Sequence, residues 1–493
     1  MGLGVMTRKP VVDILKGSRE GPSLAKSLGL LSIVALGVGD IIGAGIFVLT
    51  GTAAAQFAGP SVMLSFALGG IVCGLIGLCY AELSAMLPVS GSTYSYTYAT
   101  LGELVAWIIG WDLVLEYATG TAAVAVGWSS YATSMLRHAG LTLPPTLTAA
   151  TGTAVKLPDG STVTGIANLP AVLVVAALTA LLILGTSGSA KLNNVMVATK
   201  LAVVLAFIGV GAFYVDPVHW HPFVPANTGG FGHFGYSGLL RGSAVVFFAF
   251  LGFDAACTAA QEARNPQRDM PVGILGAVAV CTVLYVVVAA VLTGIVPYAQ
   301  LNVADPVAKG VEGIGLPWFS ALIELGALLG LTTVILVSLY GCSRVLLTVA
   351  HDGLLPPVFA RVNPRTQTPI VSQLLIGAGV AVIAAVFPIG ELSELVSIGT
   401  LLAFVLVCGA VIRLRQTDPA VERPFRMPWV PVIPIVGALC CVLLMAGLPL
   451  LAWLRLGVWM AIGLSIYAAY GRRHSVLRHP KQGAEAQRNG KPM

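Results

Sequence analysis

The chain has 493 residues, of which 57% are hydrophobic and only 10% are charged, and its mean hydropathy is +0.89. So few polar residues cannot cover the surface of a soluble globule of this length. The apolar residues instead form runs of about 20 residues or more, the length at which a helix crosses the hydrocarbon core of a bilayer. The composition therefore excludes a soluble protein and predicts an all-α integral membrane protein that contacts the lipid bilayer.

We predict about twelve membrane-spanning helices in one membrane domain over 27–471, between an N-terminal arm (1–26) and a basic tail (472–493). Continuous apolar runs, rather than segments of alternating polarity, favour helices over strands. The start of the third run could also be an interfacial helix. The predicted spans are 28–56, 60–87, 98–136, 169–186, 190–214, 238–261, 271–296, 316–346, 369–388, 391–413, 430–450 and 453–471.

The distribution of Lys and Arg predicts the orientation of these spans. With both termini in the cytoplasm, 21 of the 27 basic residues lie on the inner side, and one, Lys200, falls within a span. This arrangement agrees with the positive-inside rule. The net charge of +6 is thus a topology signal with some attraction to anionic lipid, and we expect no nucleic-acid partner.

Motifs for other classes of membrane protein are missing from the sequence. The eight cysteines fall in or beside apolar runs without metal-ligand spacing, and there is no phosphate-binding loop, nucleophile elbow or zinc motif. A membrane enzyme should also show clustered His, Cys or acidic residues at catalytic spacing. We therefore expect no enzyme activity, no ATP-driven pump, no cofactor and no metal.

Glycines disrupt two corresponding apolar runs, the first and the sixth. The first run carries four glycines around 41–47, and the sixth places Gly252 and Asp254 in mid-membrane. Glycine weakens a helix by roughly 0.8–1.0 kcal/mol relative to alanine, and unwound backbone is tolerated in a membrane only where it lines an enclosed cavity. Two broken helices five spans apart indicate an inverted repeat, 27–214 and 238–413, followed by two extra helices in 430–471. The alternative is close helix packing through small residues.

Three motifs carry a family resemblance. They are Gly-Val-Gly-Asp-Ile-Ile-Gly-Ala-Gly-Ile-Phe-Val-Leu at 37–49, Gly-Phe-Asp at 252–254 followed by Glu-Ala-Arg-Asn-Pro-Gln-Arg-Asp-Met-Pro at 262–271, and Ser-Arg at 343–344 with His-Asp-Gly-Leu-Leu-Pro at 351–356. Together they resemble the amino acid/polyamine/organocation superfamily, and most of all bacterial members of its cationic amino acid transporter branch. Asp40 departs from the pattern, in which a small uncharged residue is usual, and its role is open.

The resemblance implies a leucine-transporter-like fold of ten core helices plus two, which moves L-amino acids across the bacterial inner membrane by alternating access. The substrate carboxylate would meet backbone amides at the positive end of a half-helix, at Gly43, Ala44 and Gly45. The substrate ammonium would meet carbonyls freed in the two breaks, near Ile41, Ile42 and Phe248. The residues say nothing of an accessory subunit.

Side chains beside these breaks should set the specificity. Glu116 lies near the middle of the third span, where an ionisable group is costly unless it faces a cavity; the alternative is an ion pair or a protonated structural carboxyl. Ser338 leaves room for a long substrate side chain. Phe248 and Phe253 wall or gate the site, or are ordinary packing. Glu116 and Ser338 favour Lys, Arg or ornithine as substrate, and a small neutral amino acid such as alanine stays open.

Lys200 and Asp254 are the candidates for energy coupling. Lys200 lies near mid-membrane and resembles the lysine that sodium-independent family members place where sodium-coupled relatives bind the ion. A buried ammonium can lose its proton, so we expect proton-coupled, sodium-independent import with Asp254 as a second group on the proton path. The alternatives are a permanently charged Lys200 in an exchanger or facilitator, and a transporter-like sensor.

Glu82 and Glu103 lie near the predicted cytoplasmic ends of their spans. At that depth lipid headgroups can solvate them, or they can form a gate pair with Arg264 or Arg268.

Overall fold

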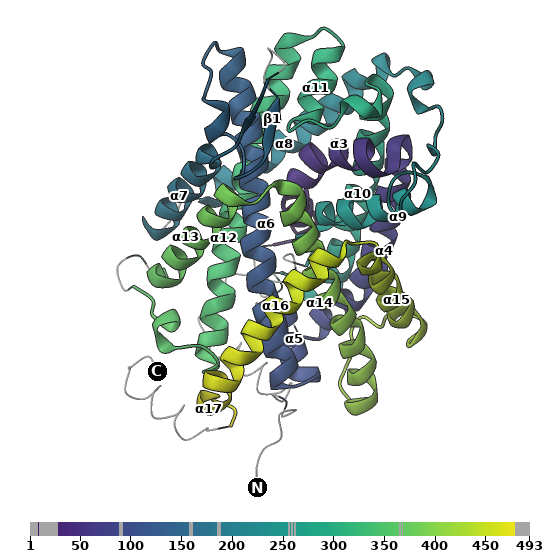
Figure 1. Cartoon of the computed structure of the whole chain (residues 1–493). Coiled ribbons are helices and arrows are strands. Elements are labelled where there is room, and N and C mark those ends of the chain that lie inside the picture. The colour runs from purple at the N-terminus through teal and green to yellow at the C-terminus, as the bar shows by residue number, and fades with distance from the viewer. Residues whose placement is uncertain are drawn as a thin grey trace.

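The computed structural model describes residues 8, 28–87, 92–156, 161–184, 189–254, 257, 260, 263–363, 366 and 368–478. They form a bundle of helices with a small two-stranded hairpin at one end (Figure 1). Most of the predicted arm (1–26) and most of the predicted tail (472–493) lie outside the described residues.

All twelve predicted runs fall on helical segments. Two of these segments are interrupted: α2 (Leu30–Ile41) continues after a break as η1 (Gly45–Leu49), α3 (Thr50–Ala53) and η2 (Ala54–Ala58), and α9 (Gly235–Val246) continues as η7 (Phe247–Phe250). The others are α4 (Val62–Met86), α6 (Glu103–His138), α7 (Leu169–Leu184), α8 (Ser189–Gly211), α10 (Pro266–Ile295), α12 (Pro317–His351), α13 (Ile370–Val386), α14 (Ile389–Thr417), α15 (Val432–Ala446) and α16 (Leu450–Ile466).

Six helical segments of the described chain are long and apolar enough to cross a membrane, and five shorter ones are also apolar. The number of spans and the inverted repeat stay predictions.

Short elements connect the long helices. The start of the predicted third span belongs to a separate helix, α5 (Ser92–Thr100), because Gly102 with φ of +97° turns the chain before α6 begins. In the following loop β1 (Ala154–Lys156) pairs antiparallel with β2 (Thr162–Thr164). The remaining elements are η3 (Gly59–Ser61), η4 (Pro145–Leu147), η5 (Ala212–Tyr214), η6 (Pro217–Trp220), η9 (Tyr298–Gln300), α11 (Pro306–Gly313), η10 (Pro357–Ala360), η11 (Tyr467–Gly471) and α17 (Arg472–His474).

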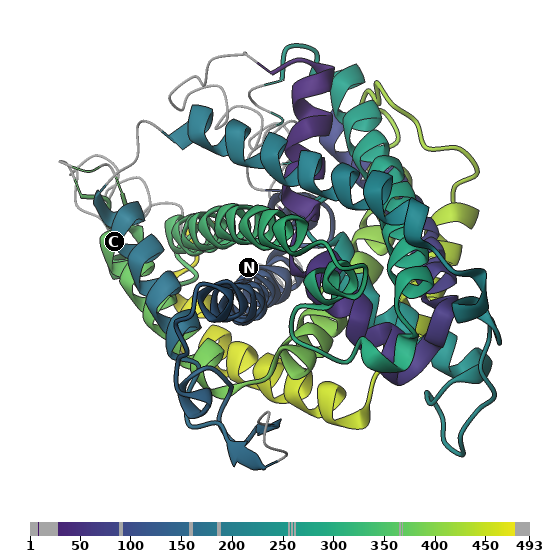
Figure 2. The ribbon, with the colours of Figure 1, turned by 90° about the horizontal axis from the view of Figure 1, so that it is seen from above.

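Two long helices, α6 and α12, run side by side through the middle of the bundle (Figure 2). Around them the interior holds large apolar side chains, among them the fully buried Trp107, Tyr80 and Phe66. On the outer helices many Leu, Ile and Val side chains are exposed, for example Leu450 at 83% and Leu173 at 60%. A surface of this kind is stable against lipid and not against water, which makes the chain an integral membrane protein.

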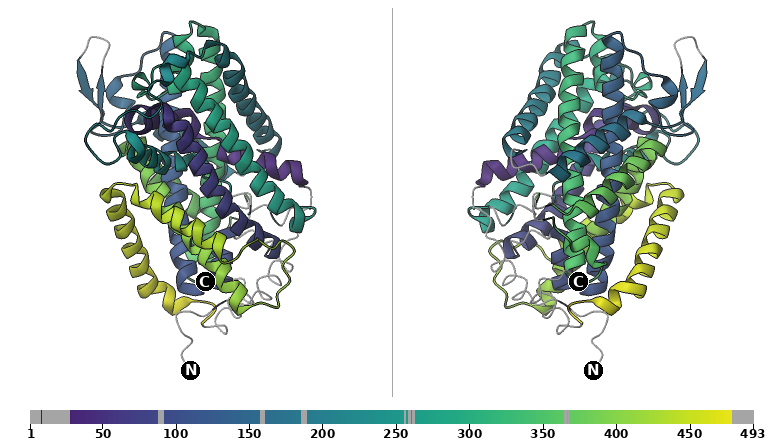
Figure 3. Two further views of the ribbon diagram at one scale, coloured as in Figure 1. Left: turned by 90° about the vertical axis from the view of Figure 1, so that its right-hand side faces the viewer. Right: turned by 90° about the vertical axis from the view of Figure 1, so that its left-hand side faces the viewer.

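The bundle has two distinct ends. The β1–β2 hairpin lies at one end and α17 at the other, as Figures 1 and 3 show. At the α17 end, Glu82 forms a two-point ion pair with Arg415 (2.9 and 2.5 Å), and Glu103 accepts from Arg478 (2.8 Å). Neither glutamate pairs with Arg264 or Arg268 among the described contacts.

Candidate functional site

The first break interrupts the helix that begins with α2. This helix ends at Ile41, Ile42 is extended (φ −72°, ψ 98°), and helical structure resumes at Gly45. A helix end leaves backbone amides and carbonyls without intrahelical partners. The break thus leaves amides at the start of the 45–58 helical segment, and carbonyls just before it, without partners within the helix.

The second break follows η7. After Phe250 the chain becomes extended at Leu251 (ψ 143°), and Gly252 has φ of +102°, a conformation that glycine adopts without strain. The two breaks touch each other: a Cβ atom on Gly45 would overlap Cα and Cβ of Ala249 in η7. Glycine at position 45 is therefore required for this contact.

Two side chains from other helices hold the breaks in place. The Tyr285 hydroxyl of α10 lies 2.7 Å from the carbonyl oxygen of Ile41 and 2.8 Å from that of Ala249, so it connects both broken helices. The fully buried Lys200 of α8 donates from its ammonium to the carbonyl oxygens of Gly39 and of Ile42, the latter at 3.0 Å. Lys200 thus places a positive charge against the carbonyls of the first break.

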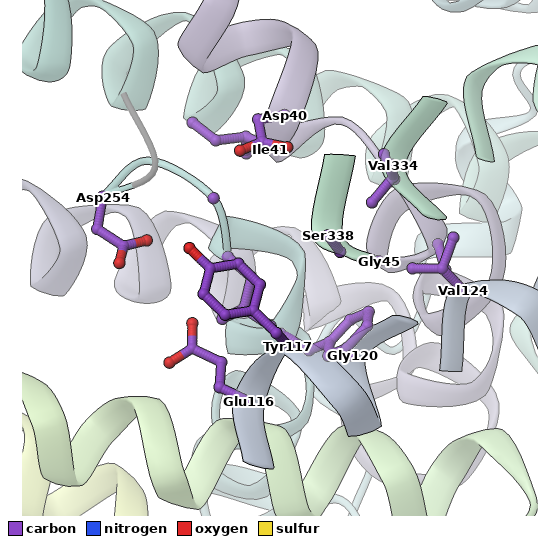
Figure 4. Close-up of a pocket in the computed structure, with 15 residues that line it drawn as sticks. Asp40, Ile41, Gly45, Glu116, Tyr117, Gly120, Val124, Asp254, Val334 and Ser338 are labelled. Atoms are coloured by element: carbon purple, nitrogen blue, oxygen red, sulfur yellow. The ribbon is translucent and has the colours of Figure 1, made fainter. Parts of the chain in front are cut away.

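A cavity lies between the breaks and the central helices, with about 530 Å³ of space between the lining atoms when the part open to solvent is included. Figure 4 shows Glu116, Tyr117 and Asp254 on one side of it, and Val124, Val334 and Ser338 on the other. The full lining is Asp40, Ile41, Gly43, Ala44, Gly45, Glu116, Tyr117, Gly120, Val124, Phe248, Leu251, Gly252, Asp254, Val334 and Ser338.

Part of the cavity lining is accessible to solvent. Gly45 and Val124 are buried, whereas six lining residues are partly exposed: Asp40, Tyr117, Gly120, Leu251, Gly252 and Ser338.

Eight of the eleven residues proposed from the sequence line this cavity. They are Ile41, Gly43, Ala44, Gly45, Glu116, Phe248, Asp254 and Ser338. Three do not: Ile42 contributes its carbonyl to Lys200, Lys200 itself lies behind the first break, and Phe253 packs its ring against Tyr80 and Phe404, with centroids 5.5 and 5.1 Å away.

Several residues of the lining, among them Gly120, Val124 and Val334, were not predicted from the sequence. Glu116, Gly120 and Val124 are spaced by four along α6, and Val334 and Ser338 are spaced by four along α12. Positions i and i+4 share one face of a helix. This spacing, counted from Glu116 and Ser338, was the available signal.

The cavity is acidic on one side and apolar on the other. Asp40, Glu116 and Asp254 bring three carboxyl groups to it, and the side chains of Glu116 and Asp254 are more than nine-tenths buried. A buried carboxylate needs a positive partner or hydrogen-bond donors, or else it takes up a proton. The three carboxyl groups can therefore bind a positively charged ligand or exchange a proton.

Comparisons with known proteins identify the family. Residues 28–462 match the family described as amino acid permease. Over 470 residues the chain is 45% identical to the methylthioribose transporter of Bacillus subtilis (strain 168), an alignment that covers 95% of this chain and 98% of the relative. It is 46% identical to the branched-chain amino acid permease BcaP of the same organism, covering 96% and 99%. Identity to the chloroplastic cationic amino acid transporter 9 of Arabidopsis thaliana is 39%, covering 81% and 68%.

Proposed function

Because the chain belongs to the amino acid permease family, we propose that it imports L-amino acids by alternating access around the cavity between the two breaks. Gly43, Ala44 and Gly45 line the cavity, and they lie just before and at the start of the 45–58 helical segment. Free amides and the positive end of a helix favour a carboxylate at this place. The substrate carboxylate would bind here.

The contact of Lys200 with the first break carries the second half of the proposal, which is sodium-independent and proton-coupled transport. Its ammonium binds the Gly39 and Ile42 carbonyl oxygens, the kind of ligand that a sodium ion would otherwise use. Because the Lys200 ammonium of α8 supplies this positive charge, the carbonyls of the first break need no bound sodium ion. Loss of the Lys200 proton would weaken both bonds and bias the equilibrium between inward and outward states.

For the substrate side chain we favour a basic group, as in arginine, lysine or ornithine. Glu116 and Asp254 lie on the same side of the cavity and are shielded from bulk water, where a carboxylate attracts a cation more strongly than at a surface. Ser338 lines the opposite side of the cavity, where its small side chain leaves room for a long substrate side chain.

A short apolar side chain, as in alanine or a branched-chain amino acid, is the second candidate. Val124 and Val334 form an apolar wall opposite the carboxyl groups. The similarity to the branched-chain amino acid permease BcaP of Bacillus subtilis supports this candidate. With such a substrate, Glu116 and Asp254 would be protonated or would serve the proton path.

Uptake by the purified full-length protein in liposomes tests the proposal. An inward proton gradient in sodium-free buffer should drive accumulation of radiolabelled arginine or leucine, and a panel of twenty unlabelled amino acids should identify the class that competes. A protonophore should abolish accumulation. Exchange without accumulation would indicate an exchanger or facilitator, and binding without any flux would indicate a sensor.

A further inference from the structure

The carbonyls of the two breaks are already engaged by the protein itself. Lys200 donates to those of Gly39 and Ile42, and the Tyr285 hydroxyl lies within hydrogen-bond distance of those of Ile41 and Ala249. In the second break, the Phe248 carbonyl accepts the Leu251 amide at 3.2 Å. A carbonyl oxygen can accept a second hydrogen bond, but none of these oxygens carries a full charge for an incoming ammonium group.

Asp40, in contrast, lines the cavity as a partly exposed residue. Within the part of the chain that the structure describes, its carboxyl group makes no hydrogen bond and no ion pair. The residue that faces it is Gly252: a Cβ atom there would lie 3.1 Å from Cγ of Asp40. Glycine at this position keeps the approach to the carboxylate clear.

Lys200 does not occupy this side of Asp40. Its ammonium points at the Gly39 and Ile42 carbonyls and does not line the cavity, although the two charges interact electrostatically. Asp40 therefore lines the cavity, whereas Lys200, which interacts with it electrostatically, does not. An ammonium group that enters a largely dehydrated cavity needs such a counter-charge.

We propose that Asp40 binds the α-ammonium group of the substrate, an inference that rests on the proposed function. Asp40 and the amides of Gly43 to Gly45 belong to the same segment, on either side of extended Ile42. An α-amino acid carries its ammonium and its carboxylate on one carbon atom. The first break thus recognises the α-amino acid group from both sides, whatever the side chain.

Binding to the purified full-length protein separates this role from an indirect one. The ligands are L-leucine, L-arginine and the α-hydroxy acid that corresponds to L-leucine, which lacks the ammonium group. For each of the two amino acids that the wild type binds, we expect Asp40→Asn to weaken binding by about 10-fold or more, the loss typical of a charge-assisted hydrogen bond. The hydroxy acid should bind the wild type more weakly, and Asp40→Asn should leave its binding unchanged. Asp216→Asn makes the same chemical change at the N-terminus of η6, outside the cavity, and should bind like the wild type.

Each other outcome is decisive. Equal loss for amino acid and hydroxy acid would mean that Asp40 acts through the shape of the break or through Lys200, and unchanged binding would mean that it does not meet the substrate; either result overturns the inference alone. A wild-type protein that binds neither amino acid overturns the proposed function together with it. Should Asp40→Asn fail to fold, Asp40→Ser introduces a smaller uncharged side chain and should give the same selective loss.

Discussion

The ammonium of Lys200 lies 3.0 Å from the carbonyl oxygen of Ile42, the extended residue at which the first helix breaks. The aliphatic part of the same side chain packs on α12, where a Cβ atom at Gly330 would lie 3.1 Å from Cβ of Lys200. One residue of α8 therefore contacts both the broken helix and the helix that forms the opposite wall of the cavity. A change in the charge of Lys200 therefore affects the contact between the broken helix and α12.

Lys200→Ala should abolish accumulation of substrate driven by a proton gradient. Removing the ammonium leaves the Gly39 and Ile42 carbonyls without their charged donor, which costs about 1–3 kcal/mol of stability. Exchange of internal for external substrate should persist, because the amides of Gly43 to Gly45 are untouched. Accumulation and exchange are measured separately in liposomes.

Lys200→Met is the matched control for packing, since it keeps an unbranched side chain against Gly330 and removes the ammonium group with its two hydrogen bonds. It should behave like Lys200→Ala in accumulation and be the more stable of the two. If Lys200→Ala still concentrates substrate with a pH gradient as the only driving force, Lys200 is a strut, and Asp254 or Glu116 carries the proton.

The sequence alone was sufficient to predict apolar helices and the position of both breaks, because apolar length and glycine clusters are local signals. It was not sufficient to show which atoms close the breaks. The Tyr285 hydroxyl that binds the Ile41 carbonyl lies 244 positions away in the sequence, and the ion pair of Glu82 with Arg415 spans 333. Phe253 belongs to a buried aromatic cluster with Tyr80 and Phe404. Such contacts depend on how the helices pack.

Gly45→Ala should disrupt transport through a steric effect. Its new methyl group would overlap the backbone of Ala249, so the two broken helices must separate. Overpacking of this kind typically costs about 1–3 kcal/mol, and we expect a lower midpoint of thermal unfolding together with loss of substrate binding. Gly74→Ala on α4, where a Cβ atom has no neighbour within 4 Å, is the control and should leave both properties intact. Normal binding by Gly45→Ala would refute the requirement for direct contact between the breaks.

Glu116→Gln should weaken arginine binding more than alanine binding. The substitution keeps the shape of the side chain and removes its charge, so a basic substrate loses an ionic partner in the cavity while a neutral one loses little. We expect about a 10-fold rise in the inhibition constant of arginine and less than a 3-fold change for alanine in competition assays. The exposed Glu422 provides the control, Glu422→Gln. Equal losses for the two amino acids would rule out a role for Glu116 in reading the side-chain charge.

Ser338→Met should shift the preference from long to short side chains. Ser338 lies on the cavity face of α12, one turn from Val334 and opposite the carboxyl groups, so a longer side chain there would fill space that a basic substrate needs. A steric change of this kind alters specificity more than total affinity. We expect the ratio of arginine to alanine uptake to fall about 10-fold or more, with alanine uptake largely retained. Ser465→Met, on the exposed face of α16, makes the same replacement outside the cavity and should leave the ratio unchanged. An unchanged ratio in Ser338→Met would show that the substrate side chain does not extend along this face of α12.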